Sequence, residues 1–383
     1  MTTNWAYLYQ QLIVLVISGA LTAVVLTVIG VLGFGSRSRW WRLCLEYPVI
    51  AAGLFVLGIR AGHLSLPPVI PTSLFPWTVG VGLAFYWMAV WWPLRVWRRR
   101  DELYSSRGGQ MTLALAVISV LGAGYAVFIE PRALEIEERT LLFDELGERE
   151  VRIAHISDTQ LIGLGPREKA LVDAVNDFRP HMIIFSGDYI AGTQDEEVAI
   201  EAMRWILSRL RSSHGMFGVN SDSDNERQRG LMFEGMPFTY LLNKSVTLDV
   251  EGVRFRIGGL NHTLPRWSRM TRGSSPEEMF IVTCHLPDHA EETGRQAPDV
   301  DLYLCGHTHG GQVQVPFFGP PVTMSTVDRH IAAGGIFKTS TGMTMALSRG
   351  VGMEGDYAPR FRFNCPPHVF LLTLGGRDAD SPR

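Results

Sequence analysis

Long, uninterrupted apolar runs fill the first third of the chain and give way to short, alternating runs in the remainder. A helix needs about 20 apolar residues to cross a hydrocarbon core of ~30 Å. Three uncharged runs, 8–32, 75–92 and 111–129, meet or approach that length and predict transmembrane helices. A fourth run, 47–60, is shorter and closely flanked by charges, so on its own it fits a re-entrant or buried helix equally well.

Arginines indicate which ends of these runs face the cytoplasm. They cluster in the loops 35–42 and 94–107, whereas 1–7 and 61–74 contain no Lys or Arg. Positive loops stay in the cytoplasm, and both basic loops lie there only if 47–60 also spans the membrane. We therefore expect an all-α bundle of four helices, multi-pass in the plasma (inner) membrane. The spans contain no lysine or acidic pair that would indicate transport, so we interpret the bundle as an anchor.

A different periodicity begins after the last span. Apolar strand-like runs alternate with amphipathic stretches, which is typical of βαβ units and a parallel sheet. Later β-type runs predict a second sheet packed on the first. The expected strands are 151–156, 182–185, 215–219, 246–250, 253–257, 279–284, 302–305, 312–315, 343–347 and 369–374, with helices at 167–178 and 196–210. The expected domains are an anchor over 1–130, an acidic linker over 131–150, an α/β domain over 151–376 and a polar tail over 377–383.

Composition and charge narrow the class of protein. Hydrophobic residues make up 46% of the chain and charged residues 19%, which excludes a disordered protein. The net charge of −3 gives no basic field, so we expect no nucleic-acid partner. The four cysteines contain no CxxC pair, which argues against a zinc ribbon or a thioredoxin-like site. We expect them to be buried as small hydrophobic side chains.

Polar side chains that can bind metals follow the apolar runs of the second half. Ligands gather at the carboxyl ends of strands in parallel sheets, and these groups lie at those ends. Carboxylates, amides and imidazoles are donors to divalent ions such as Mn²⁺, Fe²⁺ and Zn²⁺. Two such ions, about 3.5–4 Å apart, can bind a phosphoryl group and activate water, and Asp188 can bridge them through its two oxygens. The positions are Asp158, Gln160, Asp188, Asn220, His285, His307 and His309.

The order of these positions resembles the pattern of the calcineurin-like metallophosphoesterases. That family's blocks are D-x-H, G-D, G-N-H-D/E, a lone His and G-H-x-H, and their order and spacing agree with this chain over about residues 150–376. Longer strings, including GHTHGGQVQVPFFGP, CHLPDHA, SRGVGMEG and PPHVFLLTL, resemble the branch of membrane-associated bacterial phosphohydrolases. The corresponding blocks here are Asp158-Thr159-Gln160, Gly187-Asp188, Val219-Asn220-Ser221-Asp222, His285 and Gly306-His307-Thr308-His309.

The resemblance implies a fold, a pair of cations and a reaction. The fold would be a four-layer α/β/β/α sandwich. The cations would be divalent, with Mn²⁺ as the first expectation and Fe²⁺ or Zn²⁺ as alternatives. A hydroxide bridging them would attack phosphorus in line. One cation would take Asp158, Gln160, Asp188 and His309, and the other would take Asp188, Asn220, His285 and His307.

Three substitutions separate this chain from the family pattern: Val219 replaces the glycine of the third block, and the other two bear directly on the chemistry. Gln160 stands where a histidine is usual, and its neutral amide oxygen is a weaker donor than imidazole, which favours Mn²⁺. Ser221 replaces the family's histidine that is thought to protonate the leaving group, and serine has no useful pKa near neutrality. Either another group substitutes, or the leaving group needs little protonation, as in a pyrophosphate or an aryl ester. The candidate catalytic residues are therefore Asp188, Asn220, Ser221, Asp222 and His262.

The predicted function is that of a membrane-anchored, two-metal hydrolase of phosphate esters. Its location favours a substrate in or near the bilayer, such as a phospholipid or a lipid-linked phosphodiester or pyrophosphate. The alternative is a catalytically weakened fold that acts as a metal-dependent binding or scaffold module. Gln160 and Ser221 are the residues that motivate this alternative.

The arginine distribution places the C-terminal domain outside the cytoplasm, in the periplasm. A reporter enzyme that works only in the periplasm should be active when joined after Arg383, because an even number of crossings leaves both chain ends outside. The same reporter joined within loop 94–107 is the matched control and should be inactive. Activity of a cytoplasm-only reporter after Arg383 would contradict the charge-based orientation.

Overall fold

The structure of the 383-residue chain is a computed structural model. It describes residues 121–191, 195–270, 278–354 and 360–376, together with 114, 117 and 118. The chain divides into two compact units, Met1–Gly124 and Tyr125–Arg383. The expected helix bundle lies almost wholly outside the described residues, as does the polar tail. Within the described part of the chain, no helix combines the length and the apolar character needed to cross a bilayer.

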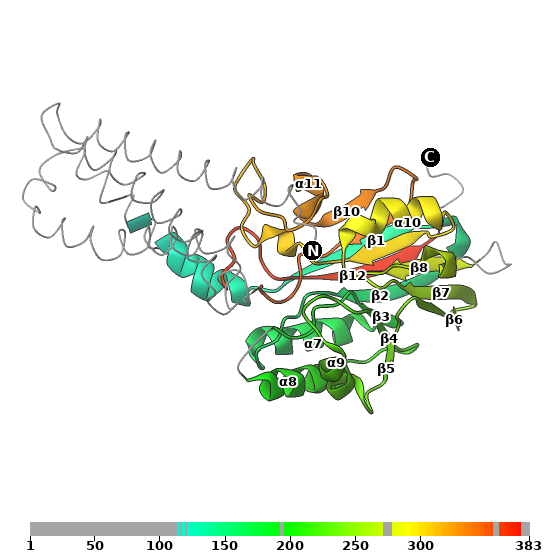
Figure 1. The fold of residues 1–383 in the computed structure, drawn as a ribbon, viewed down its shortest axis with the longest axis horizontal. Helices are drawn as coiled ribbons and strands as arrows, with labels where there is room; N and C mark the ends of the chain where they lie inside the picture. Colours follow the sequence, from blue (N-terminus) through cyan, green and yellow to red (C-terminus); the bar gives the residue numbers. More distant parts are fainter. Residues whose placement is uncertain are drawn as a thin grey trace, which may run out of the picture. The chain divides into compact units, whose positions relative to one another are not determined.

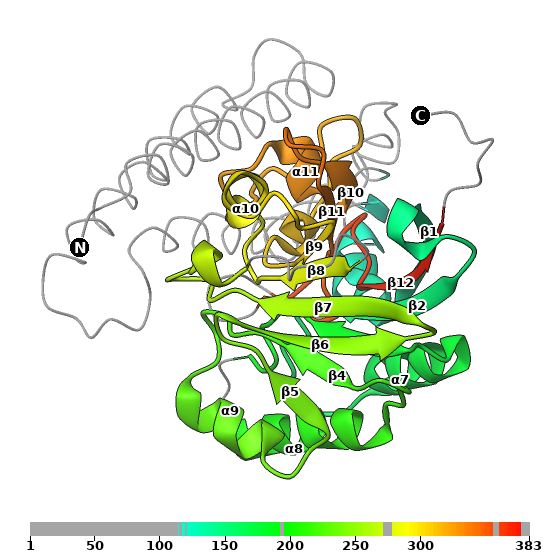
Figure 2. The ribbon, with the colours of Figure 1, turned by 90° about the vertical axis from the view of Figure 1, so that its right-hand side faces the viewer.

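Two six-stranded sheets lie face to face in the second unit, with helices on their outer faces (Figures 1 and 2). The first sheet runs in the spatial order β1 (Glu135–Leu142), β12 (His368–Gly375), β2 (Glu150–Ile156), β3 (Met182–Phe185), β4 (Met216–Gly218) and β5 (Phe238–Tyr240). The second runs β10 (Gly335–Lys338), β11 (Thr344–Leu347), β9 (Leu302–Cys305), β8 (Met279–Thr283), β7 (Val253–Gly259) and β6 (Lys244–Val250). The helices are α7 (Pro166–Phe178), α8 (Glu196–Arg209) and α9 (Glu226–Phe233) on one side, and α10 (Ala290–Gln296) and α11 (Arg329–Ala332) on the other.

Strand direction fixes where the loops of each sheet meet. The strands from β2 to β5 are mutually parallel, and so are β7, β8, β9 and β11. The antiparallel pairs among the described strands are β12 with β2, β6 with β7, and β10 with β11. The carboxyl ends of the parallel strands therefore lie along one edge of each sheet, where ligand sites form.

A continuous apolar layer fills the space between the sheets. Alternate side chains of β2 and β7 point into it, among them the fully buried Ile153, Phe255 and Ile257. Phe370 of β12 lies in the same layer. Burying a side chain of this size contributes about 1.5–3 kcal/mol, so the contact between the sheets holds the two rows of strand ends in a fixed relation.

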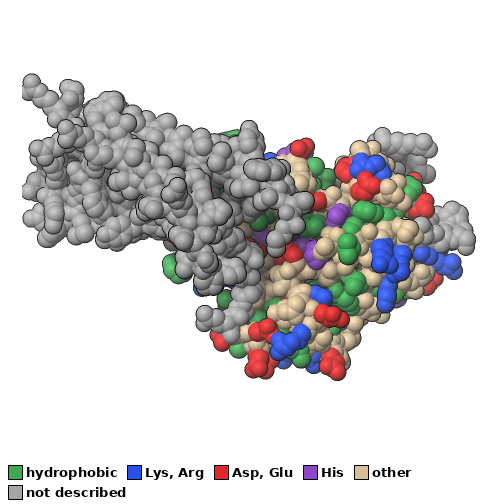
Figure 3. Space-filling view, in the orientation of Figure 1, with side chains coloured by type: hydrophobic (Ala, Val, Ile, Leu, Met, Phe, Trp, Pro, Cys, Tyr) green, Lys and Arg blue, Asp and Glu red, His purple; other side chains and the backbone are tan. Residues whose placement is uncertain are grey.

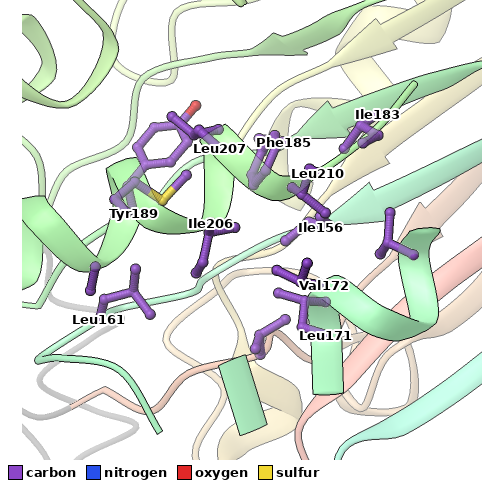
Figure 4. Packing of buried hydrophobic residues seen from close by; sticks show 14 of the residues in the cluster. Ile156, Leu161, Leu171, Val172, Ile183, Phe185, Tyr189, Ile206, Leu207 and Leu210 are labelled. Atoms are coloured by element: carbon purple, nitrogen blue, oxygen red, sulfur yellow. The ribbon is translucent and has the colours of Figure 1, made fainter. Parts of the chain in front are cut away.

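The outer helices cover the first sheet through a second apolar layer. Leu171 and Val172 of α7 and Ile206 and Leu207 of α8 pack towards Ile156 of β2 (Figure 4). Together with Val175 of α7 and Met203 of α8, these buried positions recur every three or four residues, which is the spacing that places side chains on one face of a helix. The sandwich of α/β/β/α layers that the resemblance implies is therefore confirmed.

The expected strands and helices agree with the structure to within about two residues at each end, except at 312–315. There Gln312 has a left-handed backbone, and Val313 and Val315 form only isolated bridges, with Phe363 and Gly319. The expectation of buried cysteines is confirmed for the three described ones, which are unpaired: Cys284, Cys305 and Cys365.

Residues 131–150, expected to be a linker, contain the eight-residue strand β1 instead. It pairs in parallel with β12 along its whole length, from Glu135 opposite His368 to Leu142 opposite Gly375. Most of its side chains are exposed, because β1 is the edge strand of its sheet. Charges are tolerated on edge strands and protect them from pairing with other chains. The acidic composition of 131–150 is therefore compatible with a strand, although it predicted a linker.

Candidate metal centre

Both sheets deliver polar side chains to a common edge, each from a loop that follows a strand. All of the ligand positions expected from the sequence lie in such loops, and so does His262. The first sheet contributes Asp158 and Gln160 after β2, Asp188 after β3 and Asn220 after β4, and the second contributes His262 after β7, His285 after β8, and His307 and His309 after β9.

Several of these residues have a left-handed backbone, which costs of order 1–3 kcal/mol in a non-glycine residue and is concentrated at functional sites. Neighbouring loops hold this conformation. The His307 N–H donates to Asp158 Oδ1 over 3.0 Å. A Cβ on Gly306 would lie 2.0 Å from Asp158 Oδ2, so only glycine allows this approach. The residues concerned are Asp158 (φ 49°), Gln160 (φ 34°), Asp188 (φ 53°), His307 (φ 73°) and His309 (φ 50°).

Carboxylates and imidazoles converge in three groups that overlap. In each group the ligand atoms all lie within 4.8 Å of one another. Asp188 and His285 each belong to two groups, which is the arrangement needed to hold cations side by side. The groups are Asp158 with Asp188 and His285, Asp222 with His285 and His307, and Asp188 with His309 and Glu354.

Hydrogen bonds orient two of the imidazoles towards the same point. His285 Nδ1 lies 3.0 Å from the Ser186 carbonyl oxygen and His307 Nε2 lies 3.0 Å from the Met324 carbonyl oxygen, so each of these nitrogens is the protonated donor in the neutral ring. The other nitrogens, His285 Nε2 and His307 Nδ1, are then 3.1 Å apart with lone pairs facing each other. Such a pair is repulsive unless a proton or a cation lies between them.

Three buried atoms at this edge that could ligate a cation make no hydrogen bond: Gln160 Oε1, Asn220 Oδ1 and His309 Nε2. His309 Nε2 lies 3.3 Å from Asp158 Oδ1, without hydrogen-bond geometry. A buried polar atom without a partner costs about 1–3 kcal/mol, and native structures rarely contain several together. All three belong to the predicted ligand set, and coordination to cations would satisfy them. The residues present therefore fit a pair of divalent cations.

In the absence of cations, protons would balance the negative charge at the site. Burial alone would lower the pKa of His285, but the carboxylates of Asp188, Asp222 and Asp158 raise it to about 10. Burial raises the pKa of Asp158 to about 7. Burial and the Arg362 guanidinium hold the pKa of His309 well below its usual range, so this imidazole stays neutral and available as a donor.

Ser221 lies at the site, and its hydroxyl makes hydrogen bonds to other groups of the protein. The oxygen accepts from the Asp188 N–H over 2.9 Å and donates to Asp224 Oδ2 over 3.0 Å. Asp224 also accepts from the N–H groups of Tyr189 and Ile190. Ser221 is therefore a support for the Asp188 loop. Asp224 has the same supporting role.

His262 reaches the site through Asn220. The Asn220 amide Nδ2 lies 2.9 Å from His262 Nδ1, and the ring's Nε2 lies 2.9 Å from the Thr263 hydroxyl. This network assigns the amide nitrogen to His262 and leaves Asn220 Oδ1 as the donor for a cation. Burial, with His285 nearby, lowers the pKa of His262 to about 4, so the ring is neutral at neutral pH.

Sequence reasoning missed two residues of the centre, Glu354 and Arg362. Glu354 Oε2 lies 3.1 Å from Gln160 Nε2. The fully buried Arg362 guanidinium donates to the carbonyl oxygens of Arg349, Gly350 and Gly352 and so fixes the loop that carries Glu354. The available signal was the string SRGVGMEG, which follows β11 as the other donors follow their strands.

Part of the centre is open to solvent. Asp222 is largely exposed and His307 is half-buried, whereas Asn220 beside them is buried. Histidine and acidic side chains reach the surface together on the face shown in Figure 3. A substrate could therefore approach the donors from this side without rearrangement of the core.

Comparison with known proteins gives the same interpretation. A sequence model of the calcineurin-like phosphoesterases matches residues 151–311. The chain is 27% identical over 265 residues to the uncharacterized metallophosphoesterase YkuE of Bacillus subtilis (strain 168), covering 66% of this chain and 90% of that one. It is 26% identical over 281 residues to phosphodiesterase YaeI of Escherichia coli (strain K12), covering 71% of this chain and all of that one.

Two further matches have lower sequence identity. A transmembrane protein with a metallophosphoesterase domain from Danio rerio is 21% identical over 283 residues, covering 67% of this chain and 62% of that one. Among solved structures, a dimetal phosphatase from Danio rerio has a TM-score of 0.32 at 12% identity, covering 55% of this chain and 91% of that one.

Uptake of Mn²⁺ at pH 7 should release protons. The cations must displace the proton that His285 holds with a pKa of about 10 and the one that Asp158 holds with a pKa of about 7, because ligands bind in the deprotonated form. Affinity should therefore rise with pH between about 6 and 8. Titration calorimetry in buffers of different ionisation enthalpy measures the release. A binding heat that is the same in every buffer would contradict it.

Proposed function

We propose, from the premise that this chain carries the metallophosphoesterase domain of the calcineurin-like family, that it is a membrane-anchored hydrolase of phosphodiester or pyrophosphate bonds. The family and the converging donors establish a metal-dependent phosphoesterase. The observation that carries the proposal is the sharing of Asp188 and His285 between neighbouring donor groups. Shared ligands support two cations close enough to act on one phosphoryl group.

Two divalent cations in this donor set would polarise the phosphoryl oxygens and lower the pKa of a water molecule. The chain's own contribution is orientation. Carbonyl oxygens of Ser186 and Met324 fix the rings of His285 and His307, and His262 fixes the amide of Asn220. Donors held this way need no rearrangement when charge develops on the phosphoryl group, which is how preorganised sites lower a barrier.

The protonation states at the site favour a particular leaving group. Although burial opposes it, His285 and His307 hold the pKa of Asp222 well below its usual range, so this carboxylate stays ionised. His262 is neutral at pH 7, and Ser221 donates to Asp224. None of these three candidate residues holds a proton poised for transfer near neutrality. A phosphate or an aryloxide leaves readily without protonation, which supports a pyrophosphate or an activated diester.

An apolar loop beside the centre supports a lipid-linked substrate. The loop, here the apolar rim, comprises Val315, Phe317, Phe318 and Met324, all exposed; Phe317 is fully so. It is joined to the centre because the Met324 carbonyl oxygen lies 3.0 Å from His307 Nε2. Contiguous exposed apolar side chains mark sites that bind lipid or another apolar surface. Together with the anchor expected over 1–130, the rim favours substrates whose phosphate lies at a membrane surface.

A second candidate function has its own support. The engagement of Ser221 and the substitution at Gln160 fit a domain that binds metal and phosphate without turning substrate over. The chain would then act as a metal-dependent binding or scaffold module. Measurement of turnover with metal present separates the two functions.

Asp188→Ala should lower kcat/KM for bis(p-nitrophenyl) phosphate by at least about 100-fold in excess Mn²⁺. Even residues that only support a ligand contribute 10–100-fold, and Asp188 belongs to two donor groups. The matched control is Asp173→Ala, an exposed aspartate on α7, which should leave the rate unchanged. Equal rates in wild type and Asp188→Ala would sink the hydrolytic assignment. Tight Mn²⁺ binding with no turnover in the wild type would favour the scaffold.

Phe317→Ser should lower kcat/KM several-fold for a long-chain alkyl aryl phosphodiester when substrate and protein are reconstituted in the same phosphatidylcholine vesicles. It should leave bis(p-nitrophenyl) phosphate in solution unaffected. Burying a Phe side chain contributes about 1.5–3 kcal/mol. Partial insertion of the rim into the bilayer contributes only a part of that value, and the substitution removes this part. The control is Val198→Ser, which removes a 50% exposed apolar side chain from α8. Equal losses on both substrates would show that the rim does not recognise lipid.

A further inference from the structure

A carboxylate from a distant loop, that of Glu354, lies beside Gln160, the position where the family has an imidazole. Gln160 is almost fully buried, and its Nε2 lies 3.0 Å from Asp188 Oδ2 and 3.1 Å from Glu354 Oε2. An amide nitrogen has two hydrogens, one for each carboxylate. The opposite amide assignment would place Gln160 Oε1 against two acidic oxygens and is repulsive. Gln160 therefore connects Asp188 to Glu354.

The same three loops bring His309 into contact with this pair. Ligand atoms of Asp188, His309 and Glu354 all lie within 4.8 Å of one another. The two carboxylates repel each other at this separation in the absence of a cation, because like charges in a partly buried site are weakly screened. With a divalent cation between them, the same three groups form a compact set of donors.

The loop that carries Glu354 is built to a fixed geometry. The Val351 N–H donates to the Ser157 carbonyl oxygen and the Gly352 N–H to that of Asp158. A Cβ on Gly352 would lie 2.3 Å from the Thr159 carbonyl oxygen, so glycine is required for this contact. Arg362 holds the other side of the loop through carbonyl oxygens of the Arg349–Gly352 segment. The position of Glu354 is therefore determined by the strand end that carries Asp158.

We infer that Glu354 is a metal ligand of this chain, sharing one cation with Asp188 and His309 and replacing the imidazole that the family has at position 160. Gln160 positions both carboxylates through its Nε2, and its Oε1 remains the weak neutral ligand atom described above. The inference rests on the proposed two-cation function. The exchange replaces one nitrogen donor of the site by an oxygen donor, which favours Mn²⁺ or Mg²⁺ over Zn²⁺. It also restores, with a full negative charge, the affinity that a neutral amide would lose.

The test is Mn²⁺ binding by the full chain in detergent, followed by titration calorimetry and by electron paramagnetic resonance of bound Mn²⁺. Glu354→Gln should weaken one of the two binding events by at least about tenfold and leave the other within about twofold. The matched control is Glu201→Gln, an exposed residue of α8, which should bind as the wild type does.

A second variant separates a ligand from a merely structural residue. Gln160→His in the Glu354→Gln background supplies the family's imidazole, so it should recover the weakened binding event and shift the preference towards Zn²⁺. Recovery that requires His at position 160 is not expected if Glu354 only stabilises the loop. The melting temperature of the metal-free variants provides the check on folding.

The outcomes distinguish this inference from the proposed function. Wild-type affinity at both sites in Glu354→Gln would overturn the ligand assignment, while hydrolysis by the wild type would still stand. Equal weakening of both sites, with a lower melting temperature and no recovery by Gln160→His, would also overturn it. If the wild type takes up no Mn²⁺, the proposed function fails together with the inference.

Discussion

The rest of the structure depends on negative charge buried at the edge where the two sheets meet. Asp158 is fully buried and Asp188 is 3% exposed, and an ionised carboxylate away from water costs on the order of several kcal/mol unless positive charge lies beside it. Protonated His285 supplies part of that charge, with Nε2 3.4 Å from Asp188 Oδ1. Divalent cations, which displace that proton when they bind, would supply the charge in its place. The chemistry of the site and the stability of this edge are therefore governed by the same balance of charge.

The fold meets this demand by cross-linking the loops through the backbone. Asp158 is held at three atoms: its N–H donates to the Gly187 carbonyl oxygen, its own carbonyl oxygen accepts from Gly352, and its carboxylate accepts from His307. Arg362 is buried and donates hydrogen bonds to a cluster of carbonyl oxygens on the opposite side. Among the described residues that it contacts, none is a carboxylate. Donors restrained in this way retain left-handed backbone that an isolated loop would relax.

The sequence predicted the donors that come directly after a buried strand, because a parallel sheet brings such positions together whatever the loops do. Asp188 and His285 are of this kind. Glu354 lies well beyond the end of β11, and only the fold of its loop returns it to the centre. The role of Ser221 depends on a backbone amide 33 residues away, which no local pattern encodes. The strand β1 was missed because an edge position removes the need for the apolar alternation that identifies a strand.

Two features of the centre favour the same kind of substrate. One is the proposed exchange of an imidazole for a carboxylate, and the other is that Ser221, Asp222 and His262 hold no proton poised for transfer. A carboxylate from Glu354 beside Asp188 makes the centre more negative, and this repels a dianionic monoester more than a diester, since Coulomb energy scales with the product of the charges. A leaving group that departs without a proton must be stable as an anion. A diester of pyrophosphate meets both conditions, because each phosphoryl group carries one negative charge and the group that leaves is a phosphate. In the proposed function, the apolar rim around Phe317 would contact the remaining part of such a molecule, an apolar chain at a membrane surface.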